Sequence, residues 1–138
     1  MAARLYVQLN FGGNCRQAFE FYAQHLGGSI TAMMQQKDSP APGPGSPDAV
    51  IHARLRLGET ELIGNDVPAE KFQPIRSSYL YFAVDTGEEA ERVYGVLSDG
   101  GQVYMPLEET FFATRFAMLR DRFGVSWTVI AQKPMPSR

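Results

Sequence analysis

The segment HARLRLG, residues 52–58, carries three side chains that could do chemistry. His52, Arg54 and Arg56 alternate with apolar residues, so in a β-strand all three point to one face of the sheet. A histidine can shuttle protons near neutral pH, and an arginine can hold a carboxylate or phosphate through two parallel hydrogen bonds. Each role has a structural alternative. The histidine could be buried and hydrogen-bonded to a tyrosine, and the arginines could pair with Glu59, Glu61, Glu108 or Glu109.

The same alternation places further polar and aromatic side chains on one face of two other segments. Residues 4–11 predict a strand with one apolar face, and residues 79–85 repeat that pattern. A helix must cover each apolar face, which leaves the other face to line a small-molecule pocket. His52 is the catalytic candidate. The candidate substrate-binding residues are Tyr6, Gln8, Asn10, Arg54, Tyr79, Tyr81, Phe112 and Thr128.

Several residues with reactive or aromatic side chains have a better structural explanation. Cys15 lies in a predicted first helical turn, where a thiolate is stabilised, but it also falls on the apolar stripe, which favours a buried thiol. His25 lies near the end of the same helix and compensates its dipole. Trp127 alternates onto the helix-facing side and is predicted to be core. Phe112, with its neighbour Phe111, could form either a cavity wall or a dimer contact.

The elements that position these residues occur twice. Residues 14–28 predict a helix that Asn14 caps, with Gln17 completing a capping box, and residues 86–101 predict a second helix with Thr86 and Glu89 in those places. Each helix ends at a double glycine. Each half therefore consists of a strand, a helix and three strands, repeated after about 73 residues. The predicted fold class is α+β, with two pseudo-symmetric βαβββ modules.

Residues 37–49 interrupt this pattern with four prolines and no apolar periodicity. Prolines remove backbone donors and prevent regular strand pairing. We predict a mobile loop between two strands, which is either a plain surface loop or a lid over a pocket.

Composition excludes several classes of function. The chain has 138 residues, a net charge of −2 and 44% hydrophobic residues, which is typical of one soluble domain without a basic surface for nucleic acid or membrane. The single cysteine cannot form an internal disulfide. No apolar run has the length of a signal peptide or a membrane span. The expected location is the cytoplasm.

Taken in order, several motifs resemble the vicinal oxygen chelate superfamily of glyoxalases, bleomycin-resistance proteins and dioxygenases, and in particular its PhnB-like branch. The motifs are Gly13-Asn14-Cys15, Ala18 to Tyr22, His52 to Gly58, Leu62 to Asp66, Met105 to Phe112, and Asp121 to Trp127. The resemblance implies one glyoxalase-like domain over residues 1–138, with modules at about 4–66 and 77–132. It also implies curved mixed sheets around a shared cavity.

The resemblance further implies where a divalent metal would be held in catalytic members. The four positions fall near Val7 or Gln8, on His52, on Tyr79 and on Thr128. Since only the histidine is a strong ligand, we expect no metal site of the family type and no cofactor. PhnB-like chains have also been called demethylubiquinone methyltransferases. The sequence argues against S-adenosylmethionine chemistry, because no glycine-rich turn opens a helix of a doubly wound sheet.

Three hypotheses about function remain at this stage. The first is a metal-free protein that binds a small molecule in the sheet cavity, as resistance proteins of the superfamily do. The second is a lyase, isomerase or dioxygenase that uses His52 as a base or metal ligand. The third is a structural or regulatory dimer with a vestigial pocket. Because open sheet edges invite pairing, we expect a homodimer. The sequence does not identify the ligand.

Overall fold

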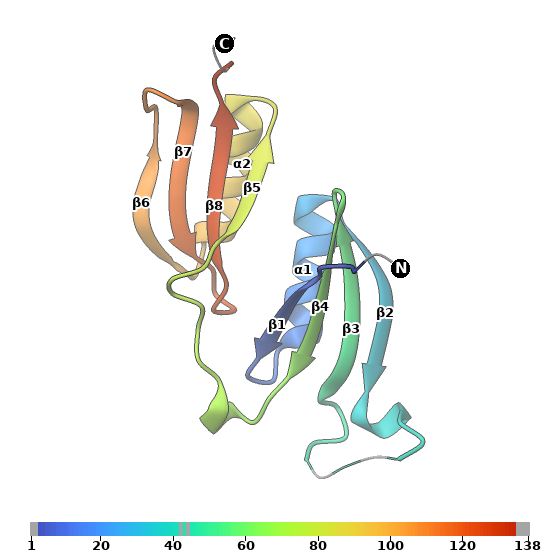
Figure 1. Ribbon diagram of the computed structural model, residues 1–138. Coiled ribbons are helices and arrows are strands. Elements are labelled where there is room, and N and C mark those ends of the chain that lie inside the picture. The colour runs from blue at the N-terminus through green and yellow to red at the C-terminus, as the bar shows by residue number, and fades with distance from the viewer. Residues whose placement is uncertain (1–2, 42, 44, 135–138) are drawn as a thin grey trace. The chain divides into compact units, whose positions relative to one another are not determined.

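The structure is a computed structural model that describes residues 3–41, 43 and 45–134. The chain divides into two units, Met1–Phe72 and Gln73–Arg138, called here the N-terminal and C-terminal units (Figure 1). The N-terminal unit holds β1 (Val7–Phe11), α1 (Cys15–Leu26), β2 (Ser29–Gln35), β3 (Val50–Leu57) and β4 (Thr60–Asp66), with short 3₁₀ turns η1 (Gln36–Asp38) and η2 (Ala69–Lys71). The C-terminal unit holds β5 (Leu80–Val84), α2 (Gly87–Ser98), β6 (Gln102–Glu108), β7 (Ala113–Arg120) and β8 (Ser126–Gln132).

Both units have the same sheet topology. The strand order is β1-β4-β3-β2 in the first and β5-β8-β7-β6 in the second. In each unit the first strand pairs in parallel with the last, and the remaining pairs are antiparallel. The predicted α+β fold of two βαβββ modules is confirmed.

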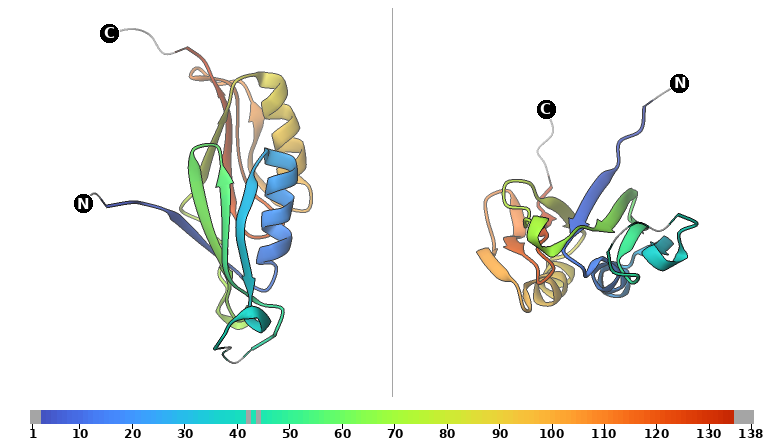
Figure 2. Two further views of the ribbon diagram at one scale, coloured as in Figure 1. Left: turned by 90° about the vertical axis from the view of Figure 1, so that its right-hand side faces the viewer. Right: turned by 90° about the horizontal axis from the view of Figure 1, so that it is seen from below.

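One helix covers one face of each sheet (Figure 2). In the N-terminal unit, Leu9 and Phe11 are buried as the alternation predicted, and the ring of Phe11 meets Phe19 of α1 edge to face at 5.9 Å. Gly64 of β4 makes this close approach possible. A Cβ there would lie 2.6 Å from Phe19 Cζ and 2.9 Å from Cys15 Sγ, so a larger residue would push the helix off the sheet.

The start of α1 corrects a sequence prediction. The Asn14 side chain makes no capping hydrogen bond. The Asp66 carboxylate at the end of β4 replaces it, since Oδ1 accepts the backbone N–H groups of Gly13 (3.1 Å) and Cys15 (2.9 Å). Oδ2 accepts the N–H of Val50 at 2.9 Å. One carboxylate therefore joins the helix, β4 and the start of β3.

The C-terminal unit uses a buried carboxylate differently. Its helix is capped as predicted, with the N–H of Glu89 donating to Thr86 Oγ1 at 3.1 Å. Asp121, 4% exposed, instead closes the turn between β7 and β8. Its carboxylate accepts the N–H groups of Phe123 (2.9 Å) and Val125 (3.0 Å) and the indole N–H of Trp127 (2.8 Å). Trp127 is 1% exposed, which confirms its core position.

The proline-containing loop has local order at its base. The Gln36 and Lys37 N–H groups donate to the carbonyls of Ala49 (2.8 Å) and Pro47 (2.9 Å). Residues 42 and 44 lie outside the described residues, and the predicted mobility of the loop stays a prediction. Across the described part of the chain, no helix is long and apolar enough to cross a membrane.

Candidate functional site

The face of the N-terminal sheet opposite α1 carries a cluster of polar side chains. The helix-facing positions of β3 are buried, namely Ala53, Leu55 and Leu57. The alternate positions, His52 and Arg54, are half-buried. The alternation predicted for this strand is therefore confirmed, and the polar side chains lie where no helix of the unit packs.

Arg54 lies at the centre of this cluster. Its Nη1 forms an ion pair with Glu61 of β4, its Nε donates to His52 Nε2 at 3.3 Å, and its guanidinium lies 5.4 Å from the ring centroid of Tyr6. The arginine is thus held from three sides. Since His52 Nε2 accepts this bond, the proton of the neutral imidazole is assigned to Nδ1.

A second group of hydrogen bonds continues the polar face across β1. The Gln8 Nε2 donates to Asn65 Oδ1 at 2.9 Å and to Asn10 Oδ1 at 3.4 Å. Sequence reasoning did not select Asn65, and it left Glu61 as one of four partners. The sequence signal that could have found both residues is the alternation in β4. Because Leu62 and Gly64 are buried on the helix side, Glu61 and Asn65 lie on the opposite, polar face.

A groove of about 460 Å³ adjoins this cluster in the same unit. Tyr6 and Glu61, which both contact Arg54, belong to the groove as well as to the cluster. Arg56 is exposed there, and no ion pair is found for it among the described residues. The groove is lined by Arg4, Leu5, Tyr6, Arg56, Glu59, Thr60 and Glu61.

The remaining candidates lie in the C-terminal unit. Tyr81 of β5 is in register with Thr128 of β8, which is 4% exposed. Tyr81 Oη accepts a 3.3 Å hydrogen bond from Gln132. Tyr79 Oη accepts one from Arg76 at 2.7 Å. Phe112 packs edge to face against Phe116, with ring centroids 5.2 Å apart.

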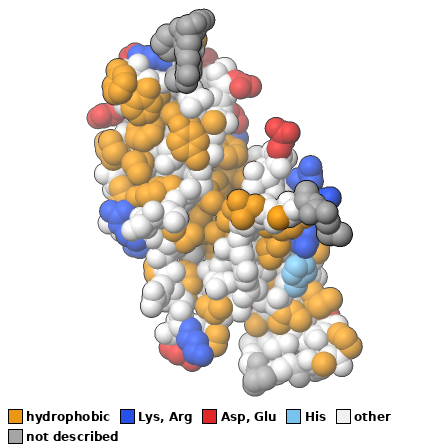
Figure 3. All heavy atoms as spheres, in the orientation of Figure 1, with side chains coloured by type: hydrophobic (Ala, Val, Ile, Leu, Met, Phe, Trp, Pro, Cys, Tyr) orange, Lys and Arg blue, Asp and Glu red, His pale blue; other side chains and the backbone are white. Residues whose placement is uncertain are grey.

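The surface around these residues of the C-terminal unit is largely hydrophobic. Figure 3 shows hydrophobic side chains gathered over the strands of this unit. Tyr81, Met105 and Phe111 are all exposed large side chains. The candidate residues therefore form two groups, one in each unit. The polar group belongs to the N-terminal unit.

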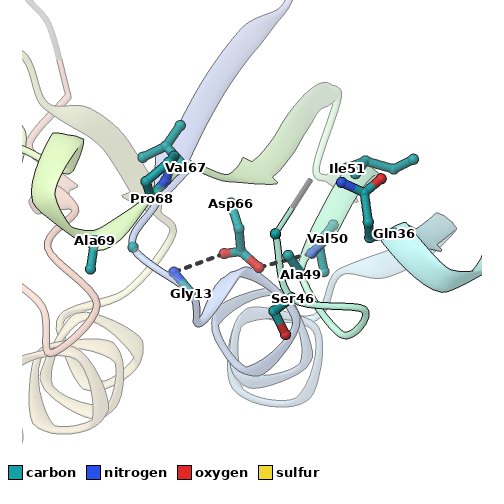
Figure 4. A pocket seen from close by; sticks show the side chains of 12 residues that line it. Gly13, Gln36, Ser46, Ala49, Val50, Ile51, Asp66, Val67, Pro68 and Ala69 are labelled. Carbon is teal, nitrogen blue, oxygen red and sulfur yellow. Dashed lines mark hydrogen bonds between the residues drawn. The ribbon is translucent and has the colours of Figure 1, made fainter. Parts of the chain in front are cut away.

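A second hollow, of about 320 Å³, lies beside the start of α1 (Figure 4). Gly45, Ser46 and Ala49 of the proline-containing loop line one side, as the lid alternative requires. The charged group in its wall is Asp66, whose carboxylate already accepts three backbone N–H groups. The hollow is therefore built around a structural carboxylate.

The nearby Cys15 has the properties of a structural thiol. It is fully buried, and burial, aided by the Asp66 carboxylate, raises its pKa to about 12. The helix N-terminus does not produce the stabilised thiolate that the sequence allowed as an alternative, because desolvation disfavours the charged form.

The family model described as 3-demethylubiquinone-9 3-methyltransferase matches residues 3–130. The chain belongs to this family. It is 28% identical to Protein YjdN of Escherichia coli (strain K12), over 94% of this chain and 96% of that protein.

Solved structures support the same placement. Protein PA1353 from Pseudomonas aeruginosa shares 41% identity and a TM-score of 0.84, with 94% of this chain and 97% of that chain covered. The PhnB protein from Bacillus cereus shares 28% identity and a TM-score of 0.82, covering 93% and 98%. A glyoxylase/bleomycin resistance protein/dioxygenase domain and two fosfomycin resistance proteins share the fold at 16% identity or less. The chain is therefore PhnB-like, and its two βαβββ modules have the glyoxalase-like fold.

The residues at the superfamily's metal-ligand positions do not fit a metal. Gln8 offers only a neutral amide oxygen, which is a weak ligand, and the His52 Nε2 lone pair faces the Arg54 guanidinium, whose positive charge would repel a cation. A tyrosine ligates well only as a phenolate, and a threonine hydroxyl is a weak ligand. Among the described residues, no group of three or more His, Cys, Asp or Glu side chains could hold a metal ion.

Proposed function

We propose that this PhnB-like protein binds a small polar molecule on the face of the N-terminal sheet opposite α1, and that it does so without a resident metal. The observation that supports this most is Arg54, which is held by Glu61, His52 and the ring of Tyr6. A guanidinium ordered before binding loses less conformational entropy when a ligand arrives.

Stability alone gives little reason for this arrangement. The side chains of Arg54 and Glu61 are 36% and 18% exposed, and ion pairs with this degree of solvent contact contribute about 0–1 kcal/mol. Ordering two long side chains has an entropic cost of similar size. The cluster is better explained by recognition, since the groove beside it adds further donors and acceptors.

Binding fits this cluster better than catalysis. A general base needs a free lone pair within reach of the substrate proton. The Nε2 lone pair of His52 accepts from Arg54, and its Nδ1 carries the proton in that tautomer. The lyase, isomerase or dioxygenase hypothesis would require Arg54 to move away first.

The family description does not decide the chemistry of this chain. S-adenosylmethionine enzymes of the usual kind bind their cofactor at the glycine-rich turn of a doubly wound parallel sheet. The two sheets here are four-stranded and mostly antiparallel. We therefore do not propose methyl transfer.

We also propose that the protein forms a homodimer. Each sheet has two edge strands, and an uncovered edge favours pairing with another chain. Phe111, which follows the edge strand β6 in sequence, is 92% exposed, which is unusual for a large aromatic residue. Sedimentation should give about twice the chain mass of 15.3 kDa, and a concentration-independent monomer would contradict this.

A ligand-detected NMR screen of small polar molecules tests the binding proposal. Hits for the wild-type protein should weaken in Arg54→Lys, which keeps the charge but loses the planar fork. Arg115→Lys is the matched control, because Arg115 has the same side-chain exposure of 36% and also pairs with a glutamate. Hits that survive Arg54→Lys, or that weaken equally in the control, would contradict the proposal.

A further inference from the structure

Tyr104 of β6 has a hydroxyl that the structure leaves without a partner. Its oxygen is buried. Among the described residues, it is the one buried side-chain N or O atom found without a hydrogen bond. A buried polar group without a partner destabilises the folded state, so such an exception calls for an explanation.

Arg76 lies directly over this tyrosine. Its guanidinium carbon is 4.0 Å from the centroid of the Tyr104 ring, which is close for a cation–π contact. Its Nη1 donates to Tyr79 Oη at 2.7 Å, and the two tyrosine rings meet edge to face at 6.4 Å. The arginine is therefore oriented by two aromatic side chains.

No carboxylate accompanies Arg76 among the ion pairs of the described residues. A guanidinium has five N–H donors, and one is engaged by Tyr79. Arg76 is also exposed, so its remaining donors are accessible. By contrast, Arg54 and Arg115 each pair with a glutamate.

We propose that Arg76, Tyr79 and Tyr104 form a binding site for a small oxyanion, a carboxylate or a phosphate, within the C-terminal unit. The guanidinium presents a planar fork that matches two anionic oxygens, while the aromatic ring holds it in place. The Tyr104 hydroxyl donates to the same ligand and loses its unpaired state. The three residues all belong to the C-terminal unit, whereas the polar cluster around Arg54 belongs to the N-terminal unit.

The anion, rather than a cation or a neutral amide, follows from the donors present. Arg76 contributes donors only, and the Tyr79 oxygen already accepts from Arg76, which leaves its own O–H to donate. Three side chains with free donors select a ligand rich in acceptors. Benzoate and inorganic phosphate represent the two chemical sources of such an oxyanion.

The test uses heteronuclear NMR titration of the full chain with benzoate, inorganic phosphate and benzylammonium, with ionic strength held constant by sodium chloride. At least one anion should saturably shift the amide signals near residues 76, 79 and 104, and benzylammonium should not. Tyr104→Phe should weaken that anion by about tenfold or more, since a hydrogen bond to a charged group contributes that much. Arg76→Lys should weaken it as well.

Tyr94→Phe is the matched control, because Tyr94 lies on α2 and has no role in the site. It should leave anion binding unchanged. Tyr104→Phe should also not destabilise the free protein, because it removes a hydroxyl that has no partner. The site is overturned if neither anion binds saturably, if benzylammonium binds equally well, or if Tyr104→Phe binds like the wild type. Binding by only one of the two anions would support the site and identify its source.

Discussion

The two units share one topology but use it differently. In the N-terminal unit, the strand face opposite the helix carries His52, Arg54 and Glu61, joined by hydrogen bonds and an ion pair. Among the described residues of the C-terminal unit, no comparable network surrounds the pair Tyr81 and Thr128, and exposed hydrophobic side chains gather there instead. The duplicated fold thus carries a polar face in one copy and a largely hydrophobic one in the other.

The two units also differ in the carboxylate that accepts backbone N–H groups. Asp66 joins three backbone segments of the N-terminal unit and is half-buried. Asp121 accepts two backbone N–H groups and the Trp127 indole at 4% exposure. Two units with the same topology can therefore place their structural carboxylates at different positions.

Removal of the two carboxylates should give the largest effects. Asp121→Ala removes the acceptor of three donors, of which those of Val125 and Trp127 are buried, and should lower the free energy of unfolding by roughly 3–5 kcal/mol. Asp66→Ala should cost about 1–3 kcal/mol, because water can reach part of its site. Urea unfolding measures both, with the single Trp127 reporting on the C-terminal unit. Equal losses of unfolding free energy in the two variants would contradict the difference described for the two carboxylates.

A methyl group added at Gly64 should have the next largest effect. Gly64→Ala places a Cβ 2.6 Å from Phe19 Cζ, and the resulting strain should destabilise the N-terminal unit by about 1–3 kcal/mol. Gly95→Ala is the control on α2, where a Cβ meets nothing within 4 Å, and it should stabilise that helix by about 0.5–1 kcal/mol. Thermal unfolding of both variants tests the pair, and a stable Gly64→Ala protein would show that α1 is not packed as described.

The Cys15 thiol should make the N-terminal unit sensitive to alkaline pH. Its pKa rises from an ordinary 9.0 to about 12 in the folded state, so the folded protein keeps a proton that the unfolded chain loses above pH 9. Stability should therefore fall as pH rises above 9, by up to about 1.4 kcal/mol per pH unit.

Urea unfolding between pH 8 and about 10 checks this slope by comparing the wild type with Cys15→Ala, which lacks the thiol. Other groups that titrate in this range are present in both proteins and cancel in the difference. Parallel pH profiles for the two proteins would contradict the assignment.

The smallest effect on stability should come from the polar cluster itself. Glu61→Gln removes the ion pair with Arg54, but partial solvent exposure limits the loss to less than about 1 kcal/mol. The same change should weaken any ligand bound through Arg54, because the arginine is no longer held in place. A loss of stability comparable to that of Asp66→Ala would mean that the cluster serves folding rather than binding.

Most of the fold could be predicted from local sequence. Each half has the order that the sequence predicted, a strand, a helix and three strands, because alternation and apolar stripes depend on neighbouring residues. The start of α1 could not be predicted in this way. Its capping group, Asp66, is 51 residues from Cys15, and no local pattern reveals a contact over that distance.

The candidate site was predicted less completely. The polar face of β3 follows from the alternation in residues 52–58, but the choice of Glu61 as the partner of Arg54 depends on the register of the β3–β4 hairpin. Of the cluster around Tyr104, sequence reasoning selected only Tyr79. Arg76 lies outside the strands, 28 residues from Tyr104 by number, and only the folded chain brings them together.

Native mass spectrometry of the protein as purified tests the central claim most directly, since it reports chain mass, metal and retained ligand together. We predict a small-molecule adduct without a metal ion, present in the wild type and in the control Arg115→Lys but lost in Arg54→Lys. An adduct of about one metal ion per chain that disappears in His52→Ala would contradict it. So would a ligand retained equally in Arg54→Lys, or the absence of any ligand from all of these proteins.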